Sequence, residues 1–363
     1  MSRERRIPSG PMREGILGIV MIVSLLGWVL LSGSPEGGLS LALARTEPQA
    51  DTAQSDVLDQ VFLPLVLHAF PASPAEWLSR LNFYRAMAKL PPVVENPEWR
   101  DGCAKHARYM VKNDIITHAE DAGNPWYTPE GDQCGRNANV MVSFSATASD
   151  TYAIDVWMQA PFHALGMIDP RLIRVGYGSY READGGYQMG AALDVLRGRG
   201  AIPANISFPI RWPGEGTTTP LRAFQVGEYP DPLAHCGYTR PAGLPILLLL
   251  GTGSITPFVT AHYVLRDGNP VAHCVFDERT YQHPTDPDQQ NLGRRILDHR
   301  DAIVIIPQEP LPRGSQYTVS ITVNGQNYTW SFFVAPDGAQ INAIEAVQEW
   351  ETQIRPAGQQ LER

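Results

Sequence analysis

The sequence predicts an α+β domain followed by an all-β sandwich. Apolar residues recur at helical spacing over much of residues 74–160, whereas strand-like runs separated by proline and glycine begin near Ile202. The 32 glycines and 31 prolines among 363 residues exceed average usage, which is about 7% and 5%. This excess favours turns and β-structure over a purely helical fold, and the length suits two domains.

The first domain is expected at residues 74–198. Its first helix places Trp77, Leu81 and Tyr84 on one face. A second begins at Asn96-Pro97, and a third begins near 150 and ends before Pro161. Residues 172–180 and 187–196 follow as two strands around a glycine-rich turn. Three helices followed by a hairpin indicate a layered α+β domain.

The second domain is expected at residues 202–335 as a β-sandwich. Its strands are expected at 245–250, 258–265, 271–276, 302–306, 317–323 and 328–334. Asn324-Gly325 is the typical turn of a two-residue hairpin. The tail, residues 336–363, carries apolar residues at helical spacing and predicts a terminal helix.

The N-terminal segment predicts export. Residues 1–14 carry four arginines, residues 16–31 are mostly apolar, and Ala42-Leu43-Ala44 suits a cleavage site. Sixteen residues make about 24 Å of helix, short of a hydrocarbon core of about 30 Å. Residues 1–44 are therefore a signal peptide or a membrane anchor, and residues 45–73 a linker. Either alternative makes the remainder extracellular, with membrane contact only through an uncleaved segment.

The charge excludes several functions. The chain has 29 basic and 38 acidic residues, a net charge of -9, which argues against a nucleic-acid partner. None of its three lysines follows a glycine, so a phosphate-binding Gly-Lys loop is excluded. The sequence also lacks the HExxH, CxxC, GxSxG and GxGxxG motifs.

Four cysteines fit an exported protein. They allow three pairings, of which Cys103 with Cys134 and Cys236 with Cys274 keeps each bridge inside one domain. The alternative is free buried thiols that act as small hydrophobic residues. An oxidising compartment favours the two disulfides.

From about Trp77 to Arg197 the chain resembles the CAP superfamily, whose bacterial form is called the SCP domain. The resemblance rests on the order and spacing of several short motifs. They are Leu81-Asn82-Phe83-Tyr84-Arg85, His106-Ala107-Arg108-Tyr109-Met110, Thr117-His118, Trp157-Met158-Gln159-Ala160-Pro161-Phe162-His163, Met167-Ile168-Asp169-Pro170 and Val175-Gly176-Tyr177-Gly178. The resemblance implies an α-β-α sandwich with a cleft in which two histidines and two acids hold a divalent metal.

Most of that metal tetrad is lost. His118 matches the first family histidine, whereas Gly135-Arg136-Asn137 stands where the family has Gly-Glu-Asn. The second acid position is Ala160. The second histidine has no clear counterpart, although His163 can occupy similar space. These departures argue against a conserved metal site and against catalysis.

Two ligand interpretations of the cleft remain open. His118 and His163, with Glu120 or Asp121 nearby, supply donors of the kind that zinc takes; otherwise they satisfy backbone groups. Trp126 and Tyr127 lie between prolines and suit stacking against a sugar or an apolar ligand. The alternative there is a rigid loop pinned through Cys134. Asn137 is a further cleft candidate, and His106 is expected to be a buried core histidine.

The second domain resembles the bacterial immunoglobulin-like modules that follow binding or catalytic domains. The resemblance rests on Leu311-Pro312-Arg313-Gly314-Ser315-Gln316-Tyr317 and on Trp330-Ser331-Phe332-Phe333-Val334. Together the resemblances imply a secreted or surface-tethered protein that binds a lipid, glycan, cell-wall or protein ligand. The alternatives are an extracellular hydrolase or peptidase that uses the cleft histidines, and a purely structural adhesion protein.

Overall fold

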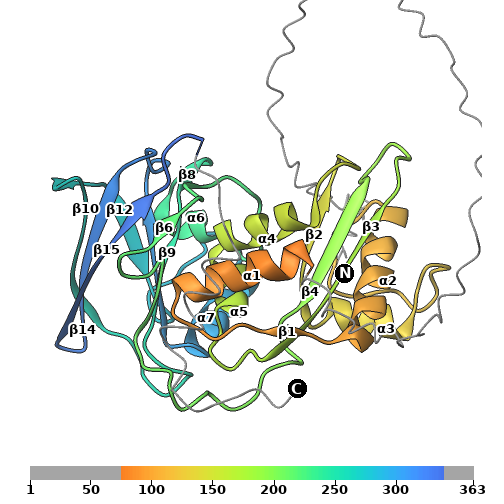
Figure 1. The fold of residues 1–363 in the computed structure, drawn as a ribbon, viewed down its shortest axis with the longest axis horizontal. Coiled ribbons are helices and arrows are strands. Elements are labelled where there is room, and N and C mark those ends of the chain that lie inside the picture. Colours follow the sequence, from red (N-terminus) through yellow and green to blue (C-terminus); the bar gives the residue numbers. More distant parts are fainter. Residues whose placement is uncertain (1–74, 339–363) are drawn as a thin grey trace, which may run out of the picture. The chain divides into compact units, whose positions relative to one another are not determined.

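Residues 75–338 are described by a computed structural model (Figure 1). Within this range no helix is long and apolar enough to cross a membrane. The predicted signal or anchor segment, the linker of residues 45–73 and the helix expected in the tail lie outside the described residues.

The N-terminal region builds one sheet and the helices that cover it. The helices are α1 (Glu76–Met87), α2 (Pro97–Lys112), α3 (Pro129–Gly135), α4 (Asp150–Gln159) and α5 (Pro161–Met167). The strands are β1 (Val94–Glu95), β2 (Ala138–Ser143), β3 (Arg174–Arg181) and β4 (Met189–Asp194), in the sheet order β1-β3-β4-β2. The three predicted helices and the β3–β4 hairpin are present, whereas α3, α5, β1 and β2 were not foreseen.

Strand β3 shows how the three layers form. Side chains alternate between the two faces of a strand, so Tyr177 points to one face and its neighbours Gly176 and Gly178 to the other. Tyr177 stacks on Trp77 of α1, with ring centroids 4.7 Å apart. A Cβ atom at Gly176 would collide with Trp99 of α2, and one at Gly178 with the α2 backbone at Ala104. The Gly-x-Gly pattern therefore lets α2 lie directly on the sheet, opposite α1 and α4 (Figure 1).

The C-terminal region contains two larger open sheets. One has the order β11-β10-β14-β15-β6 and the other β12-β13-β9-β5. The strands are β5 (Ile210–Trp212), β6 (Thr218–Thr219), β7 (Ala223–Phe224), β8 (Ala242–Gly243), β9 (Ile246–Leu249), β10 (Val259–Arg266), β11 (Asn269–Pro270), β12 (His273–Phe276), β13 (Ala302–Pro307), β14 (Gln316–Val323) and β15 (Gln326–Val334). Strands β7 and β8 form a separate pair. All six predicted strands are present.

The expectation of an all-β second domain needs correction. Helices α6 (Pro232–Cys236) and α7 (Pro287–Asp298) interrupt the strands. Both begin with proline at the first helical position, after the N-cap residues Asp231 and Asp286. The predicted β14–β15 turn is confirmed: Asn324 and Gly325 adopt φ values of 50° and 78°, as this tight turn requires. An immunoglobulin-like arrangement remains a prediction.

Both predicted disulfides are present. Cys103 of α2 is bonded to Cys134 of α3, and Cys236 of α6 to Cys274 of β12. The first bridge lies in an apolar cluster with Met110, Val140 and Val142. It therefore joins α2 to the short helix that precedes β2.

A buried cluster of charges joins the two regions. Asp169, which is fully buried, receives two hydrogen bonds from Arg171 and an ion pair of 3.1 Å from Arg300. Burial raises the pKa of Asp169, but the hydrogen bonds of Arg171 and the charge of Arg300 outweigh it and hold the pKa below its usual range. Arg171 also donates to the carbonyl of His299, next to Arg300.

Replacing Asp169→Asn is expected to lower the free energy of unfolding at pH 7 by about 3 kcal/mol, because it leaves buried guanidinium groups without a counter-charge. The folded pKa lies below the unfolded value of about 3.9, so this stabilisation is present above that pH and lost as the pH falls through the folded pKa. Urea unfolding of both proteins from pH 7 to pH 3 should therefore converge at acid pH. The exposed Asp101→Asn variant is the control, and a constant difference at all pH values would contradict the prediction.

Candidate functional site

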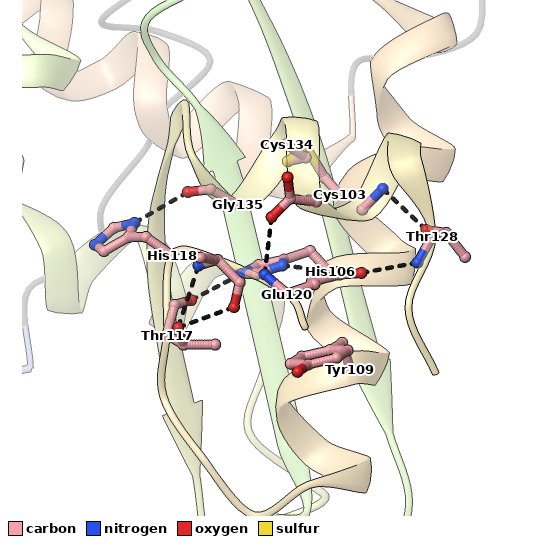
Figure 2. Close-up of polar contacts among 12 residues, drawn as sticks. Cys103, His106, Tyr109, Thr117, His118, Glu120, Thr128, Cys134 and Gly135 are labelled. Atoms are coloured by element: carbon pink, nitrogen blue, oxygen red, sulfur yellow. Dashed lines mark hydrogen bonds and ion pairs between the residues drawn. A yellow bond between two sulfur atoms is a disulfide. The ribbon is translucent and has the colours of Figure 1, made fainter. Parts of the chain in front are cut away.

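The segment between α2 and α3 carries His118 and is anchored by a buried histidine. His106 of α2 has no exposed surface; its Nδ1 lies 3.0 Å from Glu120 Oε1 and its Nε2 2.8 Å from the Thr117 carbonyl (Figure 2). The other carboxylate oxygen of Glu120 accepts the backbone N–H of Thr128 at 2.9 Å. A few buried contacts therefore fix both ends of residues 117–128.

The contacts of His106 define where one proton resides. A carbonyl can only accept, so Nε2 carries a hydrogen and donates to Thr117. Nδ1 faces a carboxylate oxygen, and one proton must lie between the two atoms. Both ring nitrogens of His106 are thus hydrogen-bonded within the protein, one to Glu120 and one to Thr117. The His106–Glu120 pair supports the segment and offers no free donor to a ligand.

Gly135 has no side chain because the His106 ring occupies that space. A Cβ atom at Gly135 would collide with three atoms of the imidazole. The Gly135 carbonyl faces the opposite way and accepts a hydrogen bond from His118 Nδ1 at 3.0 Å (Figure 2). This bond fixes the tautomer of His118 and leaves the lone pair on Nε2.

His118 is held in its neutral form. One edge of the residue is exposed, yet the protein atoms around the ring disfavour its charged form, and this desolvation lowers its pKa. The hydrogen bond to the Gly135 carbonyl raises the pKa again, whereas the charges of His163 and His106 lower it. At neutral pH, His118 therefore presents a hydrogen-bond acceptor at Nε2.

His163 is positioned by a residue from the C-terminal region. It lies in the first turn of α5, whose N-cap is Ala160, a residue with no side-chain acceptor. Glu228 supplies one instead: its Oε1 accepts the His163 backbone N–H at 2.9 Å and lies 2.6 Å from Nδ1. A carboxylate at a helix N-terminus satisfies an orphan donor and complements the helix dipole. Glu228 therefore caps α5 and orients the His163 ring.

The Glu228 side chain is completely buried, whereas that of His163 retains 16% exposure. Burial raises the pKa of Glu228, and the hydrogen bonds of His163 act against this rise. Its second oxygen, Oε2, is buried and has no hydrogen-bond partner among residues 75–338. The His163 ring thus has a buried anchored side at Nδ1, and Nε2 is the nitrogen left for other contacts.

The donors do not fit the four-ligand metal site that the resemblance implies. Glu120, proposed as a partner of His118, is committed to His106 instead. Asp121 Oδ1 accepts the backbone N–H of Gly123 in a local turn. In the described part of the chain, no three histidine, cysteine, aspartate or glutamate side chains gather to hold a metal ion. We derive no chemistry through a metal at this cleft.

The other sequence candidates serve the scaffold. Asn137 donates from Nδ2 to the Gln133 carbonyl at 2.8 Å, which closes the end of α3. Its neighbour Arg136 pairs with Asp132 on the surface at 2.7 Å. It is Asn139 that reaches α5, through a 3.2 Å bond to the His163 carbonyl.

The aromatic segment packs on α2. Arg108 and Lys112 lie over the Trp126 ring, 4.8 and 5.1 Å from its centroid. These cations occupy the ring surface that a stacked sugar would need, and favour the rigid-loop interpretation of this segment. Tyr127 is half-buried, and its backbone N–H donates to Asn124 at 3.0 Å.

A pocket of about 230 Å³ lies away from the histidines. It is formed by Ala88 and Lys89, which directly follow α1, and by the segment around Ser207 and Arg211. Neither His118 nor His163 lines it, so it is a separate feature of the surface.

Comparison with protein families gives one match. The family model described as CAP, the cysteine-rich secretory protein family, matches residues 78–193. These residues are similar to a CAP domain, and this stretch is called the CAP domain from here on. The match contains α2, the His118 segment and His163, but not Glu228. Comparison with curated proteins finds no match.

Glu228 is the site residue that sequence reasoning missed. It is 65 positions from His163 and belongs to a loop between β7 and α6, outside the CAP domain. The one local sign was the absence of a capping side chain at Ala160, which leaves α5 in need of an acceptor from elsewhere.

Replacing Glu120→Gln is expected to lower the free energy of unfolding by about 3 kcal/mol, since it removes the charged partner of a buried histidine. The loss should be local in origin, so amide hydrogen exchange of residues 117–135 should accelerate more than that of β14 or β15. Glu130→Gln, at an exposed position in the same region, is the matched control. Unchanged exchange in residues 117–135 would refute the anchoring role.

Proposed function

We propose that this protein is an extracellular binding protein whose CAP domain forms the ligand cleft around His118 and His163. The observation that carries the proposal is the fixed orientation of both rings: Gly135 holds one and Glu228 the other. Each ring keeps its Nε2 for a ligand. A pair of pre-oriented polar groups beside a rigid, disulfide-linked scaffold is typical of a binding site.

The extracellular assignment rests on the CAP domain and the two disulfides. Disulfides persist in oxidising compartments and are rare in the cytosol. The N-terminal sequence, with its basic start and apolar run, supports export, either with cleavage or with retention as an anchor. We propose that the C-terminal β-rich region acts as the presenting module and completes one wall of the cleft through Glu228.

A hydrogen-bonding ligand, such as a cell-wall glycan, fits this cleft better than a lipid chain. His118 offers an acceptor at Nε2, and His163 adds a second imidazole nitrogen. Hydroxyl groups both donate and accept, so one sugar can satisfy two such groups. A lipid chain would instead require an apolar channel.

His118→Ala and His163→Ala should each weaken binding to insoluble peptidoglycan about threefold to tenfold, because each removes one hydrogen bond. Co-sedimentation of the full chain with peptidoglycan measures this. His299→Ala, which removes an exposed histidine outside the CAP domain, is the matched control. Vesicles of phosphatidylglycerol and phosphatidylethanolamine test the lipid alternative. If all variants bind peptidoglycan equally well, His118 and His163 do not contact the ligand, and a structural adhesion role is favoured.

Hydrolysis is a second candidate, and the His163–Glu228 pair favours it. A buried carboxylate that orients an imidazole through Nδ1 is the arrangement of a general base. Neither cleft ring is hydrogen-bonded to a serine, threonine or cysteine side chain among the described residues, so the base would have to act on water. Release of reducing sugars or peptides from peptidoglycan, lost in Glu228→Gln, would support this candidate; binding without release supports the first.

A further inference from the structure

Two histidines outside the CAP domain meet between the two C-terminal sheets. His262 of β10 and His273 of β12 belong to different sheets, yet His262 Nδ1 lies 2.9 Å from His273 Nε2. The ring centroids are 5.0 Å apart and the rings are nearly perpendicular. Among the described residues, the hydrogen bonds and ring contacts of these two histidines involve no residue of the candidate site in the CAP domain.

Strand geometry brings the rings together. On β10, His262 and Val264 share one face, opposite Ile321 and Val319 of β14. Val264, Ile321 and Val319 are buried, so this face is turned toward the core. His262 itself is exposed. Because β12 is the edge strand of the second sheet, His273 can meet it where the two sheets open to solvent.

The hydrogen bonds leave a lone pair between the rings. His273 Nδ1 lies 2.7 Å from the Val271 carbonyl, to which it can only donate. In the neutral ring, Nε2 is therefore an acceptor directed at His262 Nδ1. A backbone carbonyl that fixes the tautomer is the usual outer partner of a metal-binding histidine.

We propose that His262 and His273 bind a first-row transition-metal dication, Zn²⁺ or Cu²⁺, between the two sheets. Two imidazole nitrogens at Zn–N distances of about 2.0–2.1 Å lie about 3.3 Å apart in a tetrahedral site. A separation of 2.9 Å needs only a small side-chain rotation to reach this value. For His262 to bind through Nδ1, the Nδ1 proton leaves to solvent and Nε2 takes one up, so the ring stays neutral in its other tautomer, and water completes the coordination. Hard ions such as Mg²⁺, which prefer oxygen, should not bind.

Isothermal titration of Zn²⁺ and Cu²⁺ into the tag-free full chain tests this site. We expect saturable binding of one ion per chain, tighter for Cu²⁺, and no heat with Mg²⁺. His262→Ala and His273→Ala should each weaken binding at least about tenfold. His118→Ala, in the cleft, should leave it unchanged. Absence of saturable binding, or loss of binding only in His118→Ala, would overturn the proposal.

Electron paramagnetic resonance of the Cu²⁺ complex tests the ligand set without relying on a variant. Wild type should show superhyperfine coupling to two imidazole nitrogens, and each single variant to one. Zn²⁺ should also raise the melting temperature of wild type but not of His262→Ala, since the ion links two sheets. An unchanged nitrogen count in the His262→Ala complex would refute the site.

Discussion

The buried carboxylate of Asp169 is the constraint on which the junction of the two regions depends. A buried charge is costly unless partners compensate it, and here the CAP domain supplies Arg171 while the C-terminal region supplies Arg300. The neighbouring Arg85, also fully buried, donates to the carbonyls of Met167, Asp169 and Leu172. The same cluster therefore satisfies the C-terminal end of α5 and attaches it to the following region.

Helix α5 is consequently held at both ends, and this determines how His163 is presented. Its C-terminal carbonyls are bound by Arg85, and its N-terminal N–H is capped by Glu228. The candidate site thus contains two histidine–carboxylate pairs with different roles. His106 and Glu120 consume both ring nitrogens and fix the segment of His118, whereas Glu228 holds only one nitrogen of His163. The first pair therefore supports the segment of His118, and the second leaves Nε2 of His163 for the ligand of the proposed function.

The sequence predicted α1, α2, α4 and both disulfides but missed α3, α5, α6 and α7, each of which begins with proline. Pro161 was interpreted only as the residue before which α4 ends. It is in fact the first residue of another helix, α5. The other three helices, α3, α6 and α7, each follow a residue that is a good N-cap and precedes a proline: Thr128-Pro129, Asp231-Pro232 and Asp286-Pro287. These three helix starts could therefore have been predicted from the sequence. Side-chain packing between distant segments could not be predicted in this way. Trp126, for example, packs on Arg108 and Lys112 of α2, and its own segment does not encode these contacts.

Motif reasoning also missed Glu228 for a definite physical reason. Within residues 78–193, Arg136 and Ala160 stand where the resemblance implies acids, which suggested a degenerate site. A missing side chain at a helix N-terminus, however, leaves N–H groups that some acceptor must satisfy. Glu228 does so from beyond the CAP domain, and in the same contact it orients His163. Loss of an acid inside a domain is therefore weak support for loss of a site when the following region packs against it, because the carboxylate can arrive from there.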